Sequence, residues 1–193
     1  MTDSMPPFDE SSREPSETLD SRIRAAVRDV PDFPTPGILF KDITPVLADP
    51  VLLRHVVAAM ARPYAAKDIT HVVGIESRGF LFGTPIALLL GAAFVPVRKP
   101  GKLPWQVERE SYALEYREDV IEIHRDAFAS PAGGTPRVLI VDDVLATGGT
   151  AAAACRLVER LGAQVVAVSV LMELTFLNGR SAVSHPVRAL TAY

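Results

Sequence analysis

From residue 69 onward, short apolar runs alternate with longer segments in which apolar residues recur at helical spacing. Short apolar runs bounded by turn residues are typical of buried parallel strands, and the longer segments are typical of helices. The pattern predicts strands at residues 69–75, 92–97, 137–141, 165–171 and 187–191, and helices at 79–90 and 151–161. Because strands and helices alternate, we expect an α/β protein with a mainly parallel central sheet flanked by helices.

The N-terminal part of the chain follows a different pattern. Residues 1–18 are rich in Ser, Glu, Asp and Pro and are predicted to be a disordered tail. An amphipathic helix is expected at residues 19–30, followed by a rigid loop at 31–42, because prolines interrupt any helix there. Asp49 and the following proline suit the N-cap and first turn of another helix, which we expect to reach about residue 66.

One long polar segment lies between the second and third predicted strands. Residues 98–119 carry two prolines and a glycine near their start and show no clear period. A long excursion of this kind inside a compact domain is usually an active-site lid or a disordered loop, so we predict a lid that is mobile without ligand. Residues 120–124 alternate in polarity and are expected to return as one arm of a hairpin.

Composition narrows the class of protein. A chain of 193 residues with 48% hydrophobic and 22% charged residues is typical of a soluble globular protein, and residues 19–193 are predicted to form one domain. The net charge of −3 argues against nucleic-acid binding. The longest apolar run, at 86–97, is interrupted by Gly and Pro and is too short for a membrane span. The single cysteine, Cys155, excludes an internal disulfide and favours the cytoplasm.

The stretch that follows the strand at 137–141 carries the clearest chemistry. Two adjacent carboxylates, Asp142 and Asp143, stand at the end of a parallel strand, where ligands bind in open α/β sheets. Backbone N–H groups of a small-residue turn at the start of a helix form a nest suited to a phosphate. The glycines let the backbone approach the anion, and the threonines add hydroxyl donors. The turn consists of Ala146, Thr147, Gly148, Gly149 and Thr150.

A second strand-to-helix turn contains Arg78. Because the carboxyl ends of parallel strands lie at one edge of the sheet, this turn is expected to face the same crevice as Asp142. The charge of an arginine opposes the dipole at a helix start, which favours an anion partner, and the guanidinium suits pyrophosphate in bidentate geometry.

A strand that ends in Asp-Asp and continues into Ala-Thr-Gly-Gly-Thr resembles the 5-phosphoribosyl-1-pyrophosphate (PRPP) signature of the type I phosphoribosyltransferases. Further blocks narrow the resemblance to the adenine phosphoribosyltransferases: residues 32–42 (DFPTPGILFKD), 76–83 (ESRGFLFG), and 98–104 (RKPGKLP) with 111–116 (SYALEY). The likeness covers residues 23–193. It implies a type I phosphoribosyltransferase fold with a small N-terminal base-binding hood at 19–45 and a flexible lid loop at 98–119.

The resemblance implies roles for individual residues. Asp142 and Asp143 would accept hydrogen bonds from the ribose hydroxyls, and the turn at 146–150 would hold the 5′-phosphate. The pyrophosphate-binding residues would be Arg78, Arg98 and Lys102. Leu39, Phe40, Lys41 and Val144 would surround adenine, with backbone groups of Leu39 and Lys41 reading its edge.

The lid residues implied by the resemblance are Glu115 and Tyr116, of which Tyr116 would contribute to binding the nucleotide. Glu115 and Arg78 are the catalytic candidates; Glu115 would accept a proton at the base or orient it. The family usually has Gly after the Glu-Tyr pair, whereas this chain has Arg117, so the lid hinge is expected to differ.

The implied reaction is displacement of pyrophosphate from C1 of PRPP by N9 of adenine, which gives adenosine monophosphate (AMP). Mg²⁺ would be carried by the substrate, with no direct protein ligand and with Asp142 and Asp143 as outer partners. The resemblance also implies a homodimer, with adenine and PRPP as small-molecule partners and no nucleic acid or membrane.

Alternative functions are open at this level. Phosphoribosyl transfer to a 6-oxopurine such as xanthine is the nearest, because the sequence does not show how backbone groups face the base. A non-catalytic regulator that senses PRPP or purines would predict a lost lid or an added DNA-binding domain. A nucleotide-sugar or methyl-transfer α/β enzyme is another class, but the chain has no G-x-G-x-x-G, which argues against it. No Lys precedes Thr150, so the turn is not a Walker A loop.

Overall fold

The structure is a computed structural model that describes residues 18–114, 117–129 and 133–193. The predicted tail at 1–18 lies outside these residues except for Thr18. The hydroxyl oxygen of Thr18 accepts a hydrogen bond from the Ser21 N–H, at 3.2 Å, and caps the first helix.

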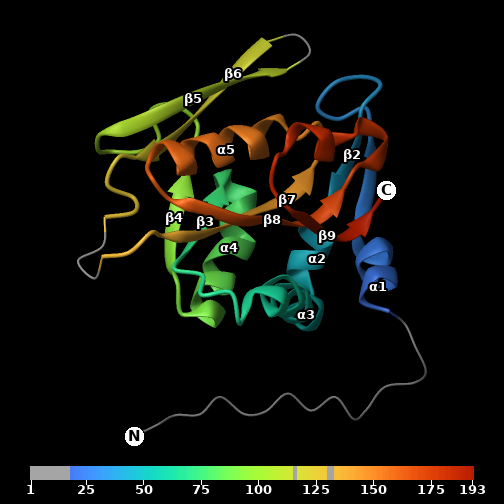
Figure 1. The fold of residues 1–193 in the computed structure, drawn as a ribbon. Coiled ribbons are helices and arrows are strands. Elements are labelled where there is room, and N and C mark those ends of the chain that lie inside the picture. The colour runs from blue at the N-terminus through green and yellow to red at the C-terminus, as the bar shows by residue number, and fades with distance from the viewer. Residues whose placement is uncertain (1–17, 115–116, 130–132) are drawn as a thin grey trace, which may run out of the picture.

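The centre of the molecule is a five-stranded sheet in which every neighbouring pair of strands is parallel, as the alternation of strands and helices predicted (Figure 1). The strand order is β4-β3-β7-β8-β9, with β9 at the edge as expected. The strands are β3 (His71–Ile75), β4 (Ala93–Val97), β7 (Arg137–Leu145), β8 (Gln164–Glu173) and β9 (Val187–Ala192).

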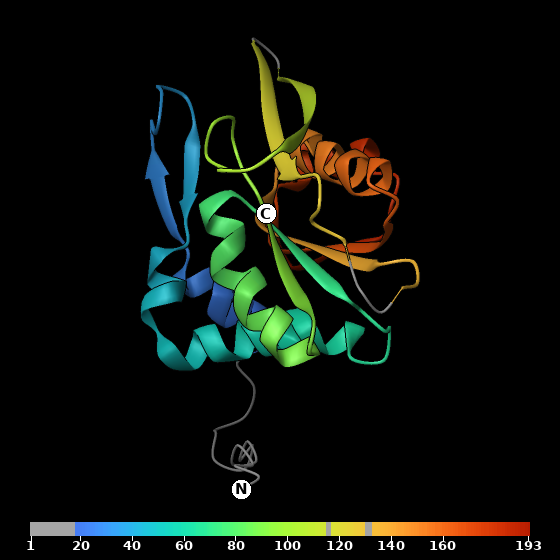
Figure 2. The ribbon, with the colours of Figure 1, turned by 90° about the vertical axis from the view of Figure 1, so that its left-hand side faces the viewer.

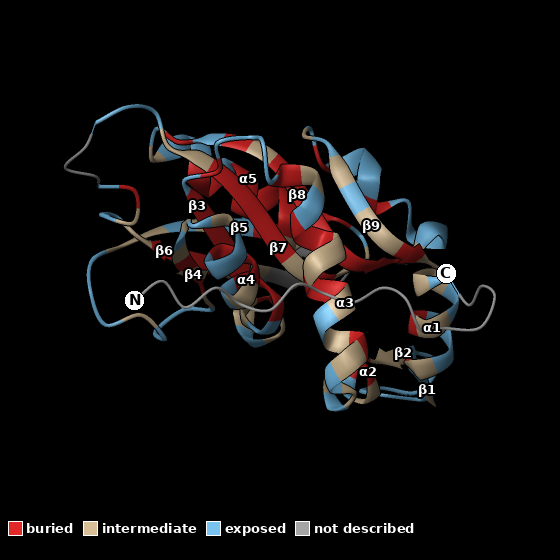
Figure 3. Cartoon of the chain, turned by 90° about the horizontal axis from the view of Figure 1, so that it is seen from below, coloured by how far each residue is buried: buried red, intermediate tan, exposed pale blue. Residues whose placement is uncertain are grey.

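Helices cover both faces of this sheet and divide the core into two clusters. One face packs against α5 (Gly149–Arg160), whose alanines are almost fully buried. The other packs against the remaining helices, and the strands between the two layers are the most buried part of the chain (Figure 3). These helices are α1 (Leu19–Ala26), α2 (Thr44–Ala48), α3 (Pro50–Ala61) and α4 (Glu76–Leu90), and short 3₁₀ turns lie at Arg62–Tyr64, Thr175–Leu177 and Gly179–Ala182.

The chain reverses its direction of winding between β3 and β7. From β3 it proceeds outward to β4, and from β7 it proceeds outward on the other side to β8 and β9. In an open parallel sheet the crevice at such a switch point, at the carboxyl ends of the strands, is where ligands bind. The fold therefore selects the ends of β3 and β7 as the place to look for the site.

The predicted loop at 31–42 is correct only for residues 32–38, because this loop joins the strands β1 (Arg28–Pro31) and β2 (Leu39–Asp42) of an antiparallel hairpin. The prolines exclude a helix but are tolerated at the end of a strand in a two-stranded ribbon. Its turn is closed by the Gly37 N–H, which donates to the Asp32 carboxylate at 2.8 Å. The hairpin stands beside α4 as a separate small sheet (Figure 2).

The predicted irregular lid at 98–119 is also corrected. Its second half is strand β5 (Val107–Leu114), which pairs antiparallel with β6 (Arg117–His124), so residues 120–124 are a hairpin arm as expected. Polar residues on both faces of β5 hid its period from the sequence pattern. The hairpin lies beside α5 (Figure 1). Ion pairs connect the two, since Arg156 and Arg160 both contact the carboxylate of Glu110.

Several predicted boundaries shift. The first helix ends at Ala26 rather than 30, and α3 ends at Ala61 rather than 66, although its predicted cap is confirmed because the Asp49 carboxylate accepts from the N–H groups of Val51 and Leu52. Helix α4 starts three residues earlier than expected, and β7 runs four residues further. Arg78 therefore lies inside a helix, and the two aspartates lie inside a strand.

Candidate active site

The ends of β3 and β7 are joined by an ion pair. The Nη1 atom of Arg78, in the first turn of α4, lies 3.2 Å from Oδ2 of Asp143 in β7. The Asp143 residue is only 1% exposed, whereas the Arg78 side chain is 44% exposed. Gly79 permits this approach, because a Cβ there would lie 2.7 Å from the Val141 carbonyl oxygen. The turn with Arg78 and the acidic strand thus meet at the carboxyl ends of β3 and β7, which agrees with their predicted placement at one edge of the sheet.

The N-terminal hairpin reaches the same place. The guanidinium carbon of Arg78 lies 5.5 Å from the centroid of the Phe40 ring, within the range of a cation–π contact. The rings of Phe33 and Phe40 pack in a T-shaped arrangement, with their centroids 5.1 Å apart. Residues from the hood, α4 and β7, far apart in the sequence, therefore meet around one guanidinium.

The two aspartates form an electrostatically coupled pair. Burial raises the pKa of Asp142 well above its ordinary value, and the neighbouring charge of Asp143 raises it further. Burial also raises the pKa of Asp143, although the Arg78 charge opposes this shift. The Asp142 Oδ1 atom accepts from the Asp143 N–H at 2.9 Å. Two carboxylates held this closely favour ligands that donate hydrogen bonds or carry positive charge.

The turn at 146–148 leads directly into α5. Gly148 is the N-cap, with a positive φ of 80°, which strongly favours glycine, and no side chain caps the helix. The first N–H groups of α5, which begins at Gly149, are therefore left for another acceptor, and the positive end of the helix dipole lies beside them. Thr147 is exposed, and Ala146, Gly149 and Thr150 are half-buried, so a ligand can reach this turn.

Arg98 is held at the end of β4 by an acid that the sequence analysis did not select. The Glu76 carboxylate accepts from the Arg98 Nε at 3.0 Å and from the Lys99 N–H at 2.7 Å. Burial would raise the pKa of Glu76, but these hydrogen bonds and the Arg98 charge outweigh it and lower the pKa. Lys102 is exposed in the turn that follows, where its N–H donates to the Lys99 carbonyl.

Glu122 is a second acid that sequence reasoning missed. It is 1% exposed, and its carboxylate accepts from the Arg109 Nε at 2.7 Å and from the Gly101 N–H at 3.0 Å. Glu122 therefore links the β5–β6 hairpin, which we call the lid hairpin, to the turn that carries Lys102. Its position between Ile121 and Ile123 in an alternating strand places it on the opposite face from these isoleucines, so the sequence pattern predicted an exposed side chain and gave no sign of its burial.

The remaining predicted base-binding residues have different surroundings. Leu39 is half exposed, and Val144 is half-buried against the core on the α4 side. The Lys41 ammonium is already engaged, 2.6 Å from the Asp29 carboxylate and 4.3 Å from the centroid of the Tyr193 ring. These contacts occupy the ammonium, which agrees with the expectation that Lys41 would contribute through its backbone. Glu115 and Tyr116 lie outside the described residues.

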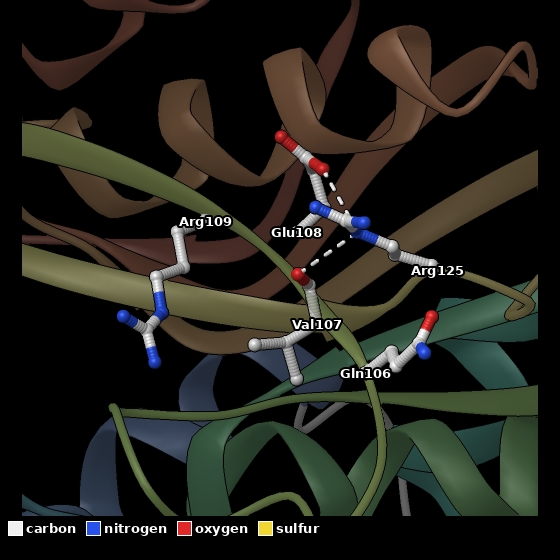
Figure 4. A pocket seen from close by; sticks show the side chains of 5 residues that line it. All are labelled: Gln106, Val107, Glu108, Arg109 and Arg125. Atoms are coloured by element: carbon white, nitrogen blue, oxygen red, sulfur yellow. Dashed lines mark hydrogen bonds and ion pairs between the residues drawn. The ribbon is translucent and has the colours of Figure 1, made fainter.

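A surface pocket of about 430 Å³ lies elsewhere, at the base of the β5–β6 hairpin (Figure 4). It is lined by Gln106, Val107, Glu108, Arg109 and Arg125. Its arginines already have acidic partners, Arg109 with Glu122 and Arg125 with Glu108. This pocket contains none of the predicted substrate-binding residues, and we do not assign it to the substrates.

Within the described parts of the chain, no group of three or more His, Cys, Asp and Glu side chains could hold a metal ion. A search of the same residues finds no helix of the length and apolarity needed to cross a membrane.

Comparison with known proteins agrees with this geometry. A phosphoribosyl transferase domain model matches residues 43–187. The adenine phosphoribosyltransferase of Anaeromyxobacter dehalogenans is 57% identical over 84% of this chain and 92% of its own length. The crystal structure of the Rhodothermus marinus enzyme of that name superposes with a TM-score of 0.85 at 52% identity, covering 91% of this chain and 98% of the other.

A third similar protein carries information on ligands. The Saccharomyces cerevisiae adenine phosphoribosyltransferase, solved with an imino-altritol bisphosphate and adenine, has a TM-score of 0.81 at 43% identity and covers 89% of this chain and 98% of its own. Matches of this identity and coverage, over a fold whose switch point carries the predicted residues, show that the chain belongs to the adenine phosphoribosyltransferase family.

Proposed function

We propose that this chain transfers the phosphoribosyl group of PRPP to adenine through the residues gathered at the ends of β3 and β7. The products are AMP and pyrophosphate. The observation that carries the residue assignment is the meeting of Phe40, Arg78 and Asp143, because it joins the hood to the acidic strand and to α4. The relatives named above act on adenine, which favours adenine over a 6-oxopurine. The lid hairpin that a non-catalytic regulator would lack is present.

The ribose and its phosphate would be held by β7 and the turn after it. The N–H groups at the start of α5, with the hydroxyls of Thr147 and Thr150, would bind the 5′-phosphate. Asp142 and Asp143 would accept hydrogen bonds from the 2′ and 3′ hydroxyls of the ribose. Their raised pKa values mean that ionisation is resisted by burial and is favoured when donors or cations arrive.

Adenine would lie against the hood hairpin. In an antiparallel pair every second residue turns its N–H and C=O away from the partner strand, so Leu39 and Lys41, two residues apart, turn theirs in the same direction. This shared direction supports reading of the adenine edge by backbone groups of both residues. Phe40 and Val144 would contact the ring faces.

The reaction itself demands little covalent chemistry from the protein. As the bond from C1 to pyrophosphate breaks and the bond to N9 forms, positive charge develops on the sugar ring. Arg78, Arg98 and Lys102 would stabilise the leaving pyrophosphate, and the lid hairpin would exclude water that hydrolyses PRPP. Glu115 would accept the proton that N9 loses or orient the base for attack.

The carboxyl groups at the site fit a substrate-borne Mg²⁺. Asp142 is half-buried in the central strand β7, and the buried Asp143 Oδ2 accepts no hydrogen bond from the described residues beside its ion pair with Arg78. Bound with PRPP, Mg²⁺ would neutralise charge on the pyrophosphate oxygens. Asp142 and Asp143 would then contact its water shell.

We further propose a cytoplasmic homodimer with no nucleic-acid or membrane partner. The exposed leucines of α4 support an interface: Leu81, Leu88 and Leu89 are 47%, 79% and 49% exposed. Three large apolar side chains exposed on one helix mark an interaction surface more often than a surface in contact with water.

The test is an assay of the purified protein with PRPP, Mg²⁺ and each of adenine, guanine, hypoxanthine and xanthine. We expect AMP and pyrophosphate to form from adenine, with no nucleotide formed from the 6-oxopurines. Equal or greater turnover of xanthine or hypoxanthine would contradict the adenine assignment. Binding of PRPP without turnover of any base would favour the regulator.

A further inference from the structure

The turn proposed to hold the 5′-phosphate lies against a second stretch of backbone from the C-terminal part of the chain. We call this stretch, residues 174–183, the bracket. It follows β8 and contains the two 3₁₀ turns at Thr175–Leu177 and Gly179–Ala182. Its first residue is fixed to the end of β7, because the Leu174 N–H donates to the Leu145 carbonyl at 2.9 Å.

The contact between turn and bracket is made by backbone on both sides. A Cβ built on Gly148 would lie 2.1 Å from the carbonyl oxygen of Gly179, and one built on Gly179 would lie 2.1 Å from the carbonyl oxygen of Ala146. Neither position therefore has room for a side chain. Gly148 also has a positive φ, but Gly179 does not, so at Gly179 the close contact alone explains the missing side chain.

An ion pair holds the bracket in place. The Nε of Arg180 lies 2.8 Å from both carboxylate oxygens of Glu173, and its Nη2 lies 2.7 Å from Oε2. The Nη1 of the same guanidinium donates to the Val187 carbonyl at 2.7 Å. Glu173, the last residue of β8, is only 6% exposed. The guanidinium thus connects Arg180, the residue after Gly179, to strands β8 and β9 of the central sheet.

We propose that Gly179 and the Arg180–Glu173 pair are positioning residues for PRPP, which set the place of the phosphate-binding turn without touching the substrate. The proposal rests on the proposed role of residues 146–150. The direction of a backbone N–H group is fixed by the backbone and cannot be adjusted by a change of side-chain rotamer. The positions of the N–H groups in the turn therefore depend on the backbone segment that packs against it, which is the bracket. PRPP binding should therefore depend on the bracket, while adenine binding, assigned to the hood, should not.

The first test is Gly179→Ala. The added methyl must displace the turn or the bracket, and we expect kcat/KM for PRPP to fall by ~10- to 100-fold, the effect of a misplacement of about 1 Å. The Kd of PRPP, measured by calorimetry, should rise while KM for adenine stays unchanged. The matched control is Gly162→Ala, since a Cβ there meets nothing within 4 Å although its φ is +78°. The control should lose stability and keep its PRPP affinity.

The second test is Arg180→Lys, which keeps the positive charge and removes the bidentate guanidinium. This variant tests the proposal even if Gly179→Ala does not fold. A rise in KM for PRPP at unchanged KM for adenine would support the proposal. An unchanged PRPP affinity, or an equal loss for both substrates, would overturn it in favour of a merely structural role.

Thr150→Ala separates this proposal from the assignment of the phosphate site. If that change leaves PRPP affinity at the wild-type value, the phosphate site is misplaced and the bracket proposal fails with it. If it weakens PRPP binding while Gly179→Ala and Arg180→Lys do not, the bracket proposal fails alone.

Discussion

Replacing Arg78 by Met should destabilise the protein in a way that depends on pH. Breaking a fully buried ion pair costs about 3–5 kcal/mol, and a surface pair contributes about 0–1 kcal/mol. Here the carboxylate is buried but the Arg78 side chain is 44% exposed, so solvent screens part of the interaction. We therefore expect the free energy of unfolding to fall by ~1–3 kcal/mol at pH 8.

The sign of the pH dependence follows from the pKa of Asp143. Burial raises this pKa above its ordinary value of 3.8, and the Arg78 charge opposes the shift, so removing Arg78 raises the pKa further. A carboxyl whose pKa is raised in the folded state costs stability when it ionises, and this cost disappears as the pH falls below the folded pKa. The destabilisation by Arg78→Met should accordingly be larger at pH 8 than at pH 5.

The assay is urea unfolding at both pH values, with Arg28→Met as the control. Arg28 is an exposed arginine whose Nη1 lies 3.7 Å from the Asp42 carboxylate, and its loss should have little effect at either pH. In an Asp143→Asn background the effect of Arg78→Met should largely vanish. Equal destabilisation at pH 5 and pH 8, or an effect no larger than the control, would refute the assignment of a coupled buried carboxylate.

Four further predictions concern the site and the assembly. Gly149→Val, at the first residue of α5, should abolish PRPP binding with the fold retained, and an unchanged calorimetric affinity would show that the nest lies elsewhere. Asp142→Asn should lower kcat/KM for PRPP by ~10- to 100-fold, as expected for a lost charged hydrogen bond; wild-type kinetics at limiting PRPP would argue against ribose binding. Glu115→Gln should lower kcat by ~10²–10⁴-fold at unchanged thermal stability if the residue moves a proton, and normal turnover and adenine affinity would make it a surface charge. Leu88→Arg should shift the protein from dimer to monomer in sedimentation, and a stable dimer would exclude α4 from the interface.

The sequence by itself determined the order of the central strands along the chain and the presence of helices between them. Apolar runs and helical spacing are local properties, so the five central strands and the helices α4 and α5 could be predicted with errors only at their ends. The acidic pair and the small-residue turn could also be recognised as candidate ligand-binding groups from the sequence, because the function suggested for each depends only on residues adjacent in the chain. Asp49 shows the same locality, since its cap needs only the two N–H groups that follow it.

Only the tertiary structure decided which distant groups meet. The hairpins at 28–42 and 107–124 depend on pairing across strands, and their prolines and two-sided polarity gave no clear period. The sequence predicted an anion near Arg78, but the structure supplies Asp143 as its partner and Phe40 as its neighbour. The contact of Gly148 with Gly179 likewise depends on two backbone segments that only the folded sheet brings together, and no local pattern marks it. Such contacts depend on tertiary packing rather than on local propensity, because they stabilise the protein only when both segments have reached their folded positions.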